Sequence, residues 1–196
     1  MAKHTRNRAF FDASSTASGH GGYVPHQTIV LVGLMGVGKT TVGRRLAKKL
    51  GLEFVDSDFE IEQAAGMSVS EIFETYGEGD FRSGERRVLT RLLDGHIKVI
   101  ATGGGAFINT ETRALIKSSA LSIWLDAETD ILVERTGRRD NRPLLSEGNS
   151  EEILKKLAAE RAPFYAEADL KITSSEGSHD TVVQAIIDAL KDLDDV

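Results

Sequence analysis

TIVLVGLMGVGKT, residues 28–40, joins an apolar run to a glycine-rich turn and to the start of a segment with helical periodicity. Its second part, Gly33 to Thr40, fits the pattern G-x-x-x-x-G-K-[ST] of a phosphate-binding loop. That motif requires a strand before it and a helix after it, and the flanking residues show both patterns. The alternative is an ordinary glycine turn. The stretch predicts binding of a nucleoside triphosphate.

The chemistry of such a loop depends on its backbone as much as on its side chains. Glycines allow successive N–H groups to converge on phosphate oxygens, and the following helix N-terminus adds positive potential. Lys39 is expected to reach the β- and γ-phosphates and to be catalytic, and the Thr40 hydroxyl is expected to ligate Mg²⁺. The predicted nucleotide contacts in this stretch are Gly36, Val37, Gly38, Lys39, Thr40 and Thr41.

Beyond this stretch, apolar runs of strand length alternate with segments of helical period. This alternation predicts an α/β fold of three layers, with a five-stranded parallel sheet between two layers of helices. The expected strands are 28–33, 53–56, 97–102, 120–125 and 170–173, and the expected helices are 39–50, 58–65, 79–93, 111–118, 128–135, 151–166 and 180–193.

Length and composition limit the class of protein. A chain of 196 residues, 40% hydrophobic, suits one globular domain rather than two. The absence of cysteine excludes a disulfide scaffold, a thiolate zinc site and a cysteine nucleophile, and it fits a cytoplasmic location. No apolar run approaches the ~18 residues of a membrane-spanning helix. A net charge of -6 argues against nonspecific binding to nucleic acid or anionic lipid.

Two segments depart from this regular pattern. Residues 1–26 include a run of Ser, Gly, Ala and His that is too poor in apolar residues to fold, so a disordered tail is expected before a phosphate-loop domain at 27–196. This basic, serine-rich tail faintly resembles an organelle transit peptide, and a bacterial extension is the alternative. Residues 137–149 contain two glycines, a proline and three arginines, which indicates a mobile flap.

A pair of acids follows the second expected strand. Asp56 and Asp58 lie two residues apart in an extended segment, so both can point into the crevice at the carboxyl ends of the strands. Asp58 could instead only cap the helix that follows. Many phosphate-loop proteins place an aspartate for Mg²⁺ after another strand, but Thr102 and glycines stand at the end of the third one here. Asp56 is therefore the better candidate for the metal.

Two further features are weak when taken singly. Arg82 and Glu85 lie three residues apart, close enough on a helix for the carboxylate to hold the guanidinium. Gly103–Gly105 follow the third strand, where the lack of side chains allows a ligand to approach the backbone. The alternatives are a surface ion pair and a flexible turn.

Taken together, these motifs resemble the shikimate kinase family over about residues 28–193. The resemblance implies a phosphate-loop fold similar to nucleoside monophosphate kinases, with an acceptor-binding region at about 58–95 and a lid at about 137–149. It implies transfer of the γ-phosphoryl group of ATP to the 3-hydroxyl of shikimate, in the chorismate pathway to aromatic amino acids, with Mg²⁺ as cofactor. The motifs occur in the family's order: Gly33–Thr40, Asp56–Asp58, Phe81-Arg82 with Glu85, Gly103–Gly105, Arg135–Gly137, Arg142–Leu145 and Arg161–Tyr165.

The resemblance also implies roles for the acceptor residues. Arg82 and Arg161 would bind the shikimate carboxylate through charge-assisted hydrogen bonds. Asp58 would accept hydrogen bonds from ring hydroxyls, and backbone N–H groups at Gly104 and Gly105 would complete the site. Glu85 would orient Arg82 without touching substrate. Without the resemblance, Arg161 would be interpreted as a solvated helix arginine.

Two arginines near the flap resemble nucleotide contacts of the family. Arg142 corresponds to the lid arginine, which is expected to be catalytic by closing over the phosphates and excluding water. Arg135 corresponds to the residue that packs on adenine, and its alternative is charge compensation at a helix C-terminus. Arg138 and Arg139 could be ordinary solvated charges of the lid.

Some alternatives stay open. Asp56 could hold a Mg²⁺-bound water or accept the proton of the substrate hydroxyl. A kinase of sugar acids similar to gluconate kinase shares the phosphate loop, and a catalytically silent relative that binds ATP is a third hypothesis. None of the five histidines shows metal-ligand spacing, and a monomer is the expectation for so small a kinase.

Overall fold

A computed structural model describes residues 23–136, 150–174 and 178–194, without the side chains of 134–136 and 150. Five strands form one sheet in the order β2-β3-β1-β4-β5, and every pair is parallel. The predicted parallel sheet is confirmed, and each strand lies within two residues of its expected bounds. The strands are β1 (Ile29–Val32), β2 (Glu53–Asp56), β3 (Lys98–Ala101), β4 (Leu121–Asp126) and β5 (Leu170–Thr173).

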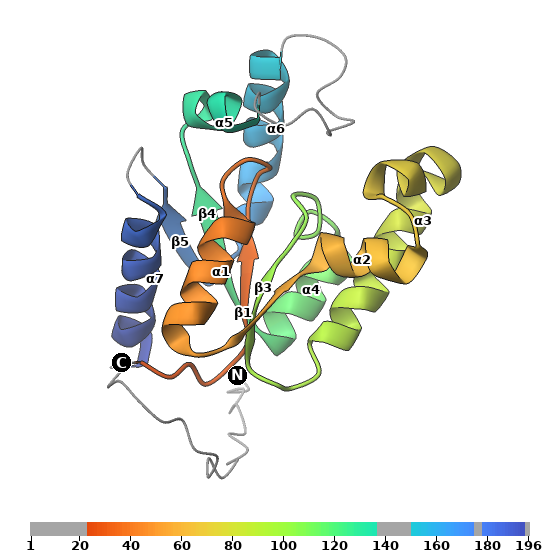
Figure 1. Ribbon diagram of the computed structural model, residues 1–196. Helices are drawn as coiled ribbons and strands as arrows, with labels where there is room; N and C mark the ends of the chain where they lie inside the picture. The colour runs from red at the N-terminus through yellow and green to blue at the C-terminus, as the bar shows by residue number, and fades with distance from the viewer. Residues whose placement is uncertain (1–22, 137–149, 175–177, 195–196) are drawn as a thin grey trace, which may run out of the picture.

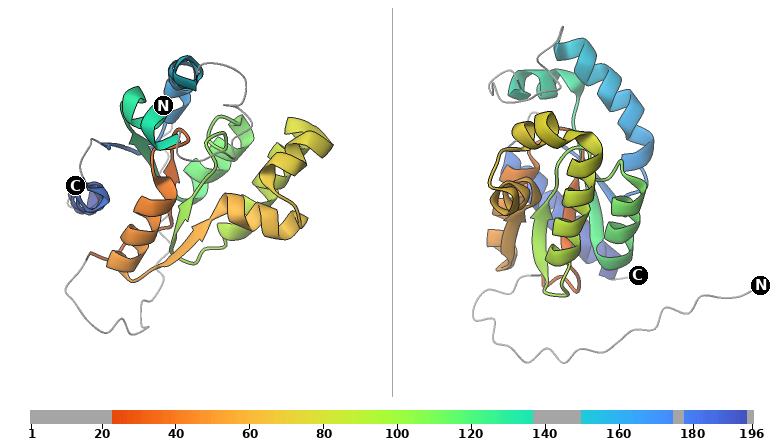
Figure 2. Two further views of the ribbon diagram at one scale, coloured as in Figure 1. Left: turned by 45° about the horizontal axis from the view of Figure 1, so that its top comes forward. Right: turned by 90° about the vertical axis from the view of Figure 1, so that its right-hand side faces the viewer.

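Helices cover both faces of the sheet, as the alternating pattern predicts. In the described residues they are α1 (Lys39–Leu50), α2 (Ser57–Ala65), α3 (Val69–Leu92), α4 (Thr110–Ser119), α5 (Thr129–Thr136), α6 (Ser150–Tyr165) and α7 (His179–Asp194). Helices α1 and α7 pack on one face and α4 on the other (Figure 2). None of the helices described is both long enough and apolar enough to cross a bilayer.

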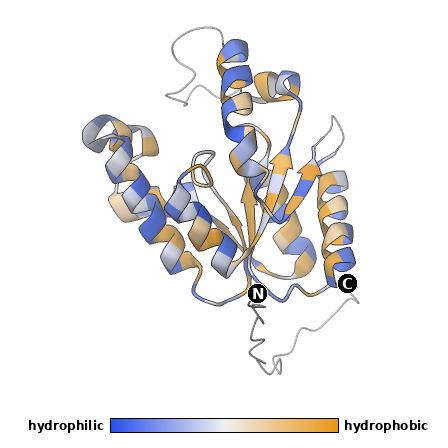
Figure 3. Ribbon diagram, turned by 180° about the vertical axis from the view of Figure 1, so that it is seen from behind, coloured by the Kyte–Doolittle hydropathy of each residue, from blue (hydrophilic) through white to orange (hydrophobic). Residues whose placement is uncertain are grey.

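Strand β1 lies at the centre of the core. All four of its residues are buried, because helices cover both faces and a neighbouring strand lies on each side. Val30 is opposite Ile100 of β3 and Ser122 of β4. The hydrophobic colouring of the central strands in Figure 3 follows this burial. The loop that leaves β1 is therefore anchored on the most protected element of the fold.

The carboxyl ends of the strands share one edge of the sheet, where a crevice forms in open parallel sheets. In Figure 1, α5 and α6 rise above this edge, while α2 and α3 extend to one side of it. Helices α2 and α3 also pack against each other. This arrangement places the loops after β1, β2 and β3 between two projecting pairs of helices.

One helix differs from its expected bounds. The sequence predicts a helix over 79–93, but α3 begins ten residues earlier, at Val69. Ser68 and Glu71 form a reciprocal capping box at its start. Gly77, with the non-helical angles φ 78° and ψ 174°, kinks α3 into two helical segments, and the second segment corresponds to the helix predicted over 79–93. The folded part also begins before residue 27, because Tyr23 packs against the core and Pro25 is buried.

Candidate active site

The loop between β1 and α1 has the backbone of an anion-binding turn. Gly33, Gly36 and Gly38 all have positive φ, a conformation that glycine adopts without the steric cost of a Cβ. At Gly33 a Cβ would also overlap the carbonyl oxygen of Leu125. The glycines of the motif are therefore required by the geometry of the turn itself.

Helix α1 begins without a side-chain cap. Gly38 is its N-cap residue and makes no side-chain hydrogen bond, whereas Asp56, Ser68 and Asn109 cap α2, α3 and α4. The cap residue therefore provides no side-chain acceptor for the first N–H groups of α1. A phosphate group is a suitable acceptor at such a helix N-terminus.

Lys39 and Thr40 point toward different neighbours. The Nζ of Lys39 donates to the carbonyl oxygens of Gly33 at 2.7 Å and Leu34 at 2.9 Å, so the ammonium lies against the turn that it follows. The hydroxyl of Thr40 donates to Oδ2 of Asp56 at 2.7 Å. This hydrogen bond links the first turn of α1 to the end of β2 through two oxygen-bearing side chains.

This pair fits a magnesium ion that is also bound by phosphates. Mg²⁺ prefers hard oxygen donors and in kinases uses only one or two side chains besides phosphates and water. Within the described ranges no group of three His, Cys, Asp or Glu residues could hold a metal. Thr40 and Asp56 are the residues that would hold the ion. Thr102 does not compete for this role, since its hydroxyl donates to the Leu31 carbonyl at 2.9 Å.

The cap of α2 is Asp56, not Asp58. Oδ1 of Asp56 accepts from the backbone N–H of Asp58 at 3.1 Å and Phe59 at 3.5 Å, and the helix begins at Ser57, one residue earlier than expected. The reading of Asp58 as only a cap is therefore wrong. The carboxylate of Asp58 therefore does not serve as the helix cap.

Asp58 carries a buried oxygen that has no hydrogen-bond partner among the described residues, Oδ1. Burial raises the pKa of this carboxyl to about 6, and the negative charge of Asp56 adds to the increase. Lys39 and Arg82 act in the opposite direction. A buried oxygen without a hydrogen-bond partner is suited to accept hydrogen bonds from the hydroxyl groups of a ligand.

Arg82 projects from α3 between two carboxylates. Nη1 donates to Oε2 of Glu85 at 2.8 Å, and both Nε and Nη2 approach Oε1 of Glu78, at 3.3 and 3.2 Å. Glu85 is completely buried, and burial raises its pKa to about 7 although Arg82 opposes the shift. The predicted pairing of Glu85 with Arg82 is present in the structure.

Three glycines bring these side chains together. A Cβ on Gly103 would lie 2.6 Å from Oδ1 of Asp58, and one on Gly105 would lie 2.6 Å from Cζ of Arg82 and overlap its Nη2. A Cβ on Gly104 would come within 3.6 Å of Nη1 of Arg161, and within 3.3 Å of the backbone nitrogen of Met35 in the phosphate loop. The loop after β3 therefore adjoins both the acceptor side chains and the nucleotide side.

Tyr165 supports this loop, a role that the motif Arg161–Tyr165 did not assign to it. Tyr165 is buried, and its hydroxyl and Nη1 of Arg161 both donate to the carbonyl oxygen of Gly104, at 2.5 and 3.2 Å. Burial raises the pKa of Tyr165 to about 12, so it stays a donor at neutral pH. Only its position four residues after Arg161, on the same helix face, could have indicated this role.

Arg113 supports the same loop from α4. Its Nη1 donates to the carbonyl oxygens of Phe107 at 2.9 Å and Ile108 at 3.0 Å. Its Nε pairs with Glu167 at 3.2 Å, and its guanidinium lies 5.2 Å from the centre of the Phe164 ring. Arg113 thus joins the segment after Gly105 to the segment that carries Arg161.

Not every predicted residue can be placed. Arg142 and the flap at 137–149 lie outside the described residues, as does the side chain of Arg135 at the end of α5. Gly36, Val37, Gly38, Lys39, Thr40 and Thr41 form the phosphate loop and the start of α1, as expected. The acceptor residues that come together are Asp58, Arg82, Glu85, Gly104, Gly105 and Arg161.

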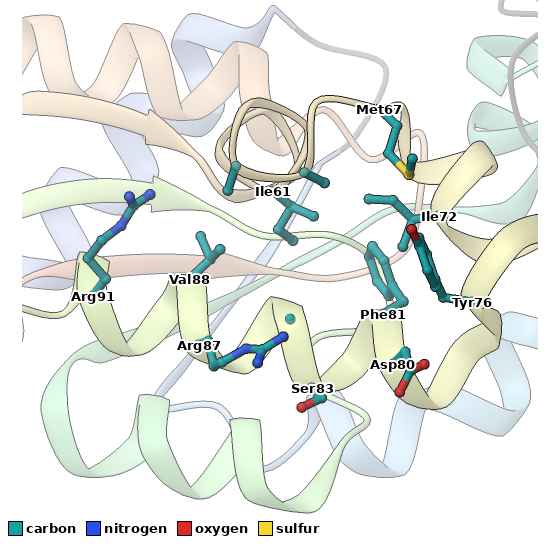
Figure 4. A pocket seen from close by; sticks show the side chains of 13 residues that line it. Ile61, Met67, Ile72, Tyr76, Asp80, Phe81, Ser83, Arg87, Val88 and Arg91 are labelled. Carbon is teal, nitrogen blue, oxygen red and sulfur yellow. The ribbon is translucent and has the colours of Figure 1, made fainter.

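A cavity of about 660 Å³ lies between α2 and α3 but is separate from these side chains (Figure 4). Its lining includes Ile61 of α2 and Phe81 and Val88 of α3, and none of the acceptor residues just named. A smaller cavity of about 350 Å³, between α3 and the start of α4, is lined in part by Arg82 and Gly79. Arg82 therefore adjoins the smaller of these two cavities.

Comparison with known proteins identifies one family. The shikimate kinase family model matches residues 35–191. The shikimate kinase of Bradyrhizobium diazoefficiens is 54% identical over 165 residues, which are 84% of this chain and 80% of that protein. The shikimate kinase of Caulobacter vibrioides is also 54% identical, over 84% of this chain and 82% of its own length.

Solved structures agree with the sequence relatives. Shikimate kinase from Acinetobacter baumannii, in complex with shikimate, is 41% identical, with a TM-score of 0.82 over 85% of this chain and 93% of that one. A gluconokinase from Sinorhizobium meliloti is 17% identical, with a TM-score of 0.58 over 85% of this chain and 93% of its own. At that identity the likeness to gluconokinase shows the fold alone.

The environment of Asp58 predicts a gain in stability when its charge is removed. The pKa of Asp58 is raised from 3.8 to about 6, so the carboxyl contributes stability at low pH that is lost as the pH rises through about 6. We expect Asp58→Asn to raise the free energy of unfolding at pH 7 by about 1–3 kcal/mol and to change it little at pH 4.

Urea unfolding at the two pH values measures this difference. Asp80→Asn, which removes an exposed carboxylate from α3, is the matched control and should change stability by less than ~0.5 kcal/mol. A loss of stability in Asp58→Asn at pH 7 would contradict the account of a desolvated carboxylate.

Proposed function

This chain belongs to the shikimate kinase family, and on that premise we propose how its own residues divide the work of transferring the γ-phosphoryl group of ATP to the 3-hydroxyl of shikimate. Phosphoryl transfer passes through a loose transition state, so a protein contributes mainly alignment and charge stabilisation. The observation that carries the proposal is that Gly103–Gly105 adjoin Asp58, Arg82, Arg161 and the phosphate loop at once. The phosphoryl donor and the phosphoryl acceptor would therefore bind next to each other.

The nucleotide end holds the triphosphate. Backbone N–H groups at Gly36, Val37 and Gly38 and in the first turn of α1 donate to phosphate oxygens. Lys39, which lies against the Gly33 and Leu34 carbonyls, offsets charge on the γ-phosphoryl group. Thr40 and Asp56 would hold Mg²⁺, which supplies further charge neutralisation at the phosphates when it is bound.

The acceptor end recognises one carboxylate and several hydroxyls. Arg82 and Arg161 bind the carboxylate, and both are already fixed, Arg82 by Glu85 and Arg161 by the Gly104 carbonyl. Asp58 accepts hydrogen bonds from ring hydroxyls through its unpartnered buried oxygen. The backbone at Gly104 and Gly105 completes the site, since a side chain there would exclude the ring.

Asp56 and Asp58 divide the proton and metal chemistry between them. One oxygen of Asp56 already accepts from a backbone N–H at the start of α2 and the other accepts from the Thr40 hydroxyl, which supports a role at the metal. The raised pKa of Asp58 supports a role as acceptor for the hydroxyl proton near neutral pH. The Arg135 contact with adenine and the closing of Arg142 over the phosphates are proposals that rest on the family resemblance, because both side chains lie outside the described residues.

The remaining parts of the proposal concern the setting of the reaction. We expect a cytoplasmic monomer with a tail that precedes Tyr23, an acceptor-binding region at about 58–95 and a lid at about 137–149. A chain without cysteine supports a reducing compartment. The net charge of -6 supports small-molecule substrates rather than nucleic acid or anionic membranes as partners.

A coupled assay of ADP release, with shikimate and gluconate supplied in parallel, tests the function. We expect ATP-dependent turnover with shikimate and little with gluconate, because two arginines and a buried aspartate fit a rigid ring acid. Lys39→Met should stay folded and lose at least about a hundredfold in kcat, since charge on the γ-phosphoryl group is no longer offset. Equal or faster turnover of gluconate would refute the assignment.

Gly105→Ala tests the close approach of Arg82 to the loop after β3. The added methyl would displace the guanidinium, so we expect the KM for shikimate to rise about tenfold or more while the KM for ATP changes less than about twofold. Gly84→Ala is the control, since its Cβ meets open space and helix propensity should add about 0.5–1 kcal/mol of stability. An unchanged KM for shikimate in Gly105→Ala would show that Arg82 does not bind the acceptor.

A further inference from the structure

Arg82 is held by two carboxylates in very different settings. Glu85 is fully buried, and its Oε2 accepts from Nη1 at 2.8 Å, the length of a strong charge-assisted hydrogen bond. The Glu78 side chain is 68% exposed, and one of its oxygens is shared between Nε and Nη2 at 3.3 and 3.2 Å. The contact with Glu85 is expected to hold Arg82 in place at all times, whereas the contact with Glu78 is a weak ion pair at the surface.

The contact with Glu78 occupies a particular edge of the guanidinium. Nε and Nη2 form the edge on which an arginine binds a carboxylate through two parallel hydrogen bonds. Nη2 is also the atom of Arg82 that lies closest to Gly105, and so to the loop that adjoins the phosphate side. Arg82 and Gly79 line the small cavity between α3 and α4, so this region is open to a solute.

We infer that Glu78 is an internal competitor of the substrate: in the empty site it occupies the edge of Arg82 that the shikimate carboxylate takes, and it must release that edge before the acceptor binds. This inference rests on the proposed role of Arg82 as a carboxylate ligand. Glu85 stays in place throughout, because it uses the other terminal nitrogen, Nη1.

A competitor of this kind has a defined effect on affinity. Molecules in which Glu78 holds Arg82 cannot bind the carboxylate at that edge. The apparent affinity for shikimate is therefore the intrinsic affinity multiplied by the fraction of molecules in which the edge is free. Exposed ion pairs are weak, which limits the effect to a few-fold. The Arg82 side chain is only 18% exposed, and Glu78 keeps its guanidinium paired while no substrate is present.

The test is Glu78→Gln, which keeps the shape of the side chain and removes its charge. We expect the KM for shikimate to fall about twofold to fivefold, with kcat and the KM for ATP unchanged. The Kd of shikimate measured by calorimetry without nucleotide should fall by the same factor. The methyl ester of shikimate, which lacks the anionic carboxylate, should show no gain.

Asp80→Asn is the matched control, because it removes one negative charge two residues away on the same helix, from a side chain that lines the other cavity. We expect it to leave the KM for shikimate unchanged. If the KM for shikimate fell equally in both variants, the cause would be a general effect of charge rather than competition, and the inference would be overturned. A rise in KM for Glu78→Gln would also overturn it, since Glu78 would then position Arg82 for binding.

The result separates this inference from the proposed function. If the wild-type protein does not phosphorylate shikimate, the proposed function fails and the inference falls with it. If the wild type is active and Glu78→Gln leaves the KM unchanged, only the inference fails. Thermal unfolding of each variant identifies any change that arises from lost folding, and an exposed side chain on α3 should move Tm by no more than a few degrees.

Discussion

The close packing of the loop after β3 against its neighbours is the constraint on which the site depends. Gly103, Gly104 and Gly105 have no side chains, and Asp58 and Arg82 occupy the space that Cβ atoms on Gly103 and Gly105 would need, while Arg161 lies next to Gly104. The same loop approaches the phosphate loop at Met35. Tyr165 and Arg113 fix it from two further helices through backbone carbonyls. A side chain at Gly103 or Gly105 would overlap Asp58 or Arg82 and displace it from this loop.

The site is arranged at some cost in stability. Asp58 and Glu85 are buried acids whose pKa values are raised mainly by burial, and each keeps one buried oxygen without a partner among the described residues. Such groups are destabilising in an empty protein, because desolvation is not fully offset by hydrogen bonds. Arg82 and Lys39 provide the opposing charge. A ligand with hydroxyl donors and a carboxylate would satisfy what the folded chain leaves unsatisfied.

Much of the fold follows from local sequence, and the failures have identifiable causes. The phosphate loop could be predicted because it needs glycines at fixed places, and strands β1, β3 and β4 because a buried parallel strand leaves a nearly continuous apolar run. The edge strands β2 and β5 are only partly buried and were predicted from shorter apolar runs. The first turns of α3 were missed because Gly77 and Gly79 indicate a break, although the capping box at Ser68 was present in the sequence. The contacts of Tyr165 with Gly104 and of Arg113 with Glu167 depend on how distant elements meet, which local periodicity does not encode. Arg82 with Glu85 was predictable because both lie on one helix face.

The central claim is that a carboxylated ring lies on the loop after β3, between the arginines of α3 and α6 and beside the phosphate loop. A crystal structure of the protein with shikimate and a nonhydrolysable ATP analogue measures this directly. The account predicts the carboxylate within hydrogen-bond distance of Arg82 and Arg161, a ring hydroxyl on Asp58, and the 3-hydroxyl facing the γ-phosphoryl group. A ring bound in the cavity between α2 and α3, or with its carboxylate away from both arginines, would contradict it.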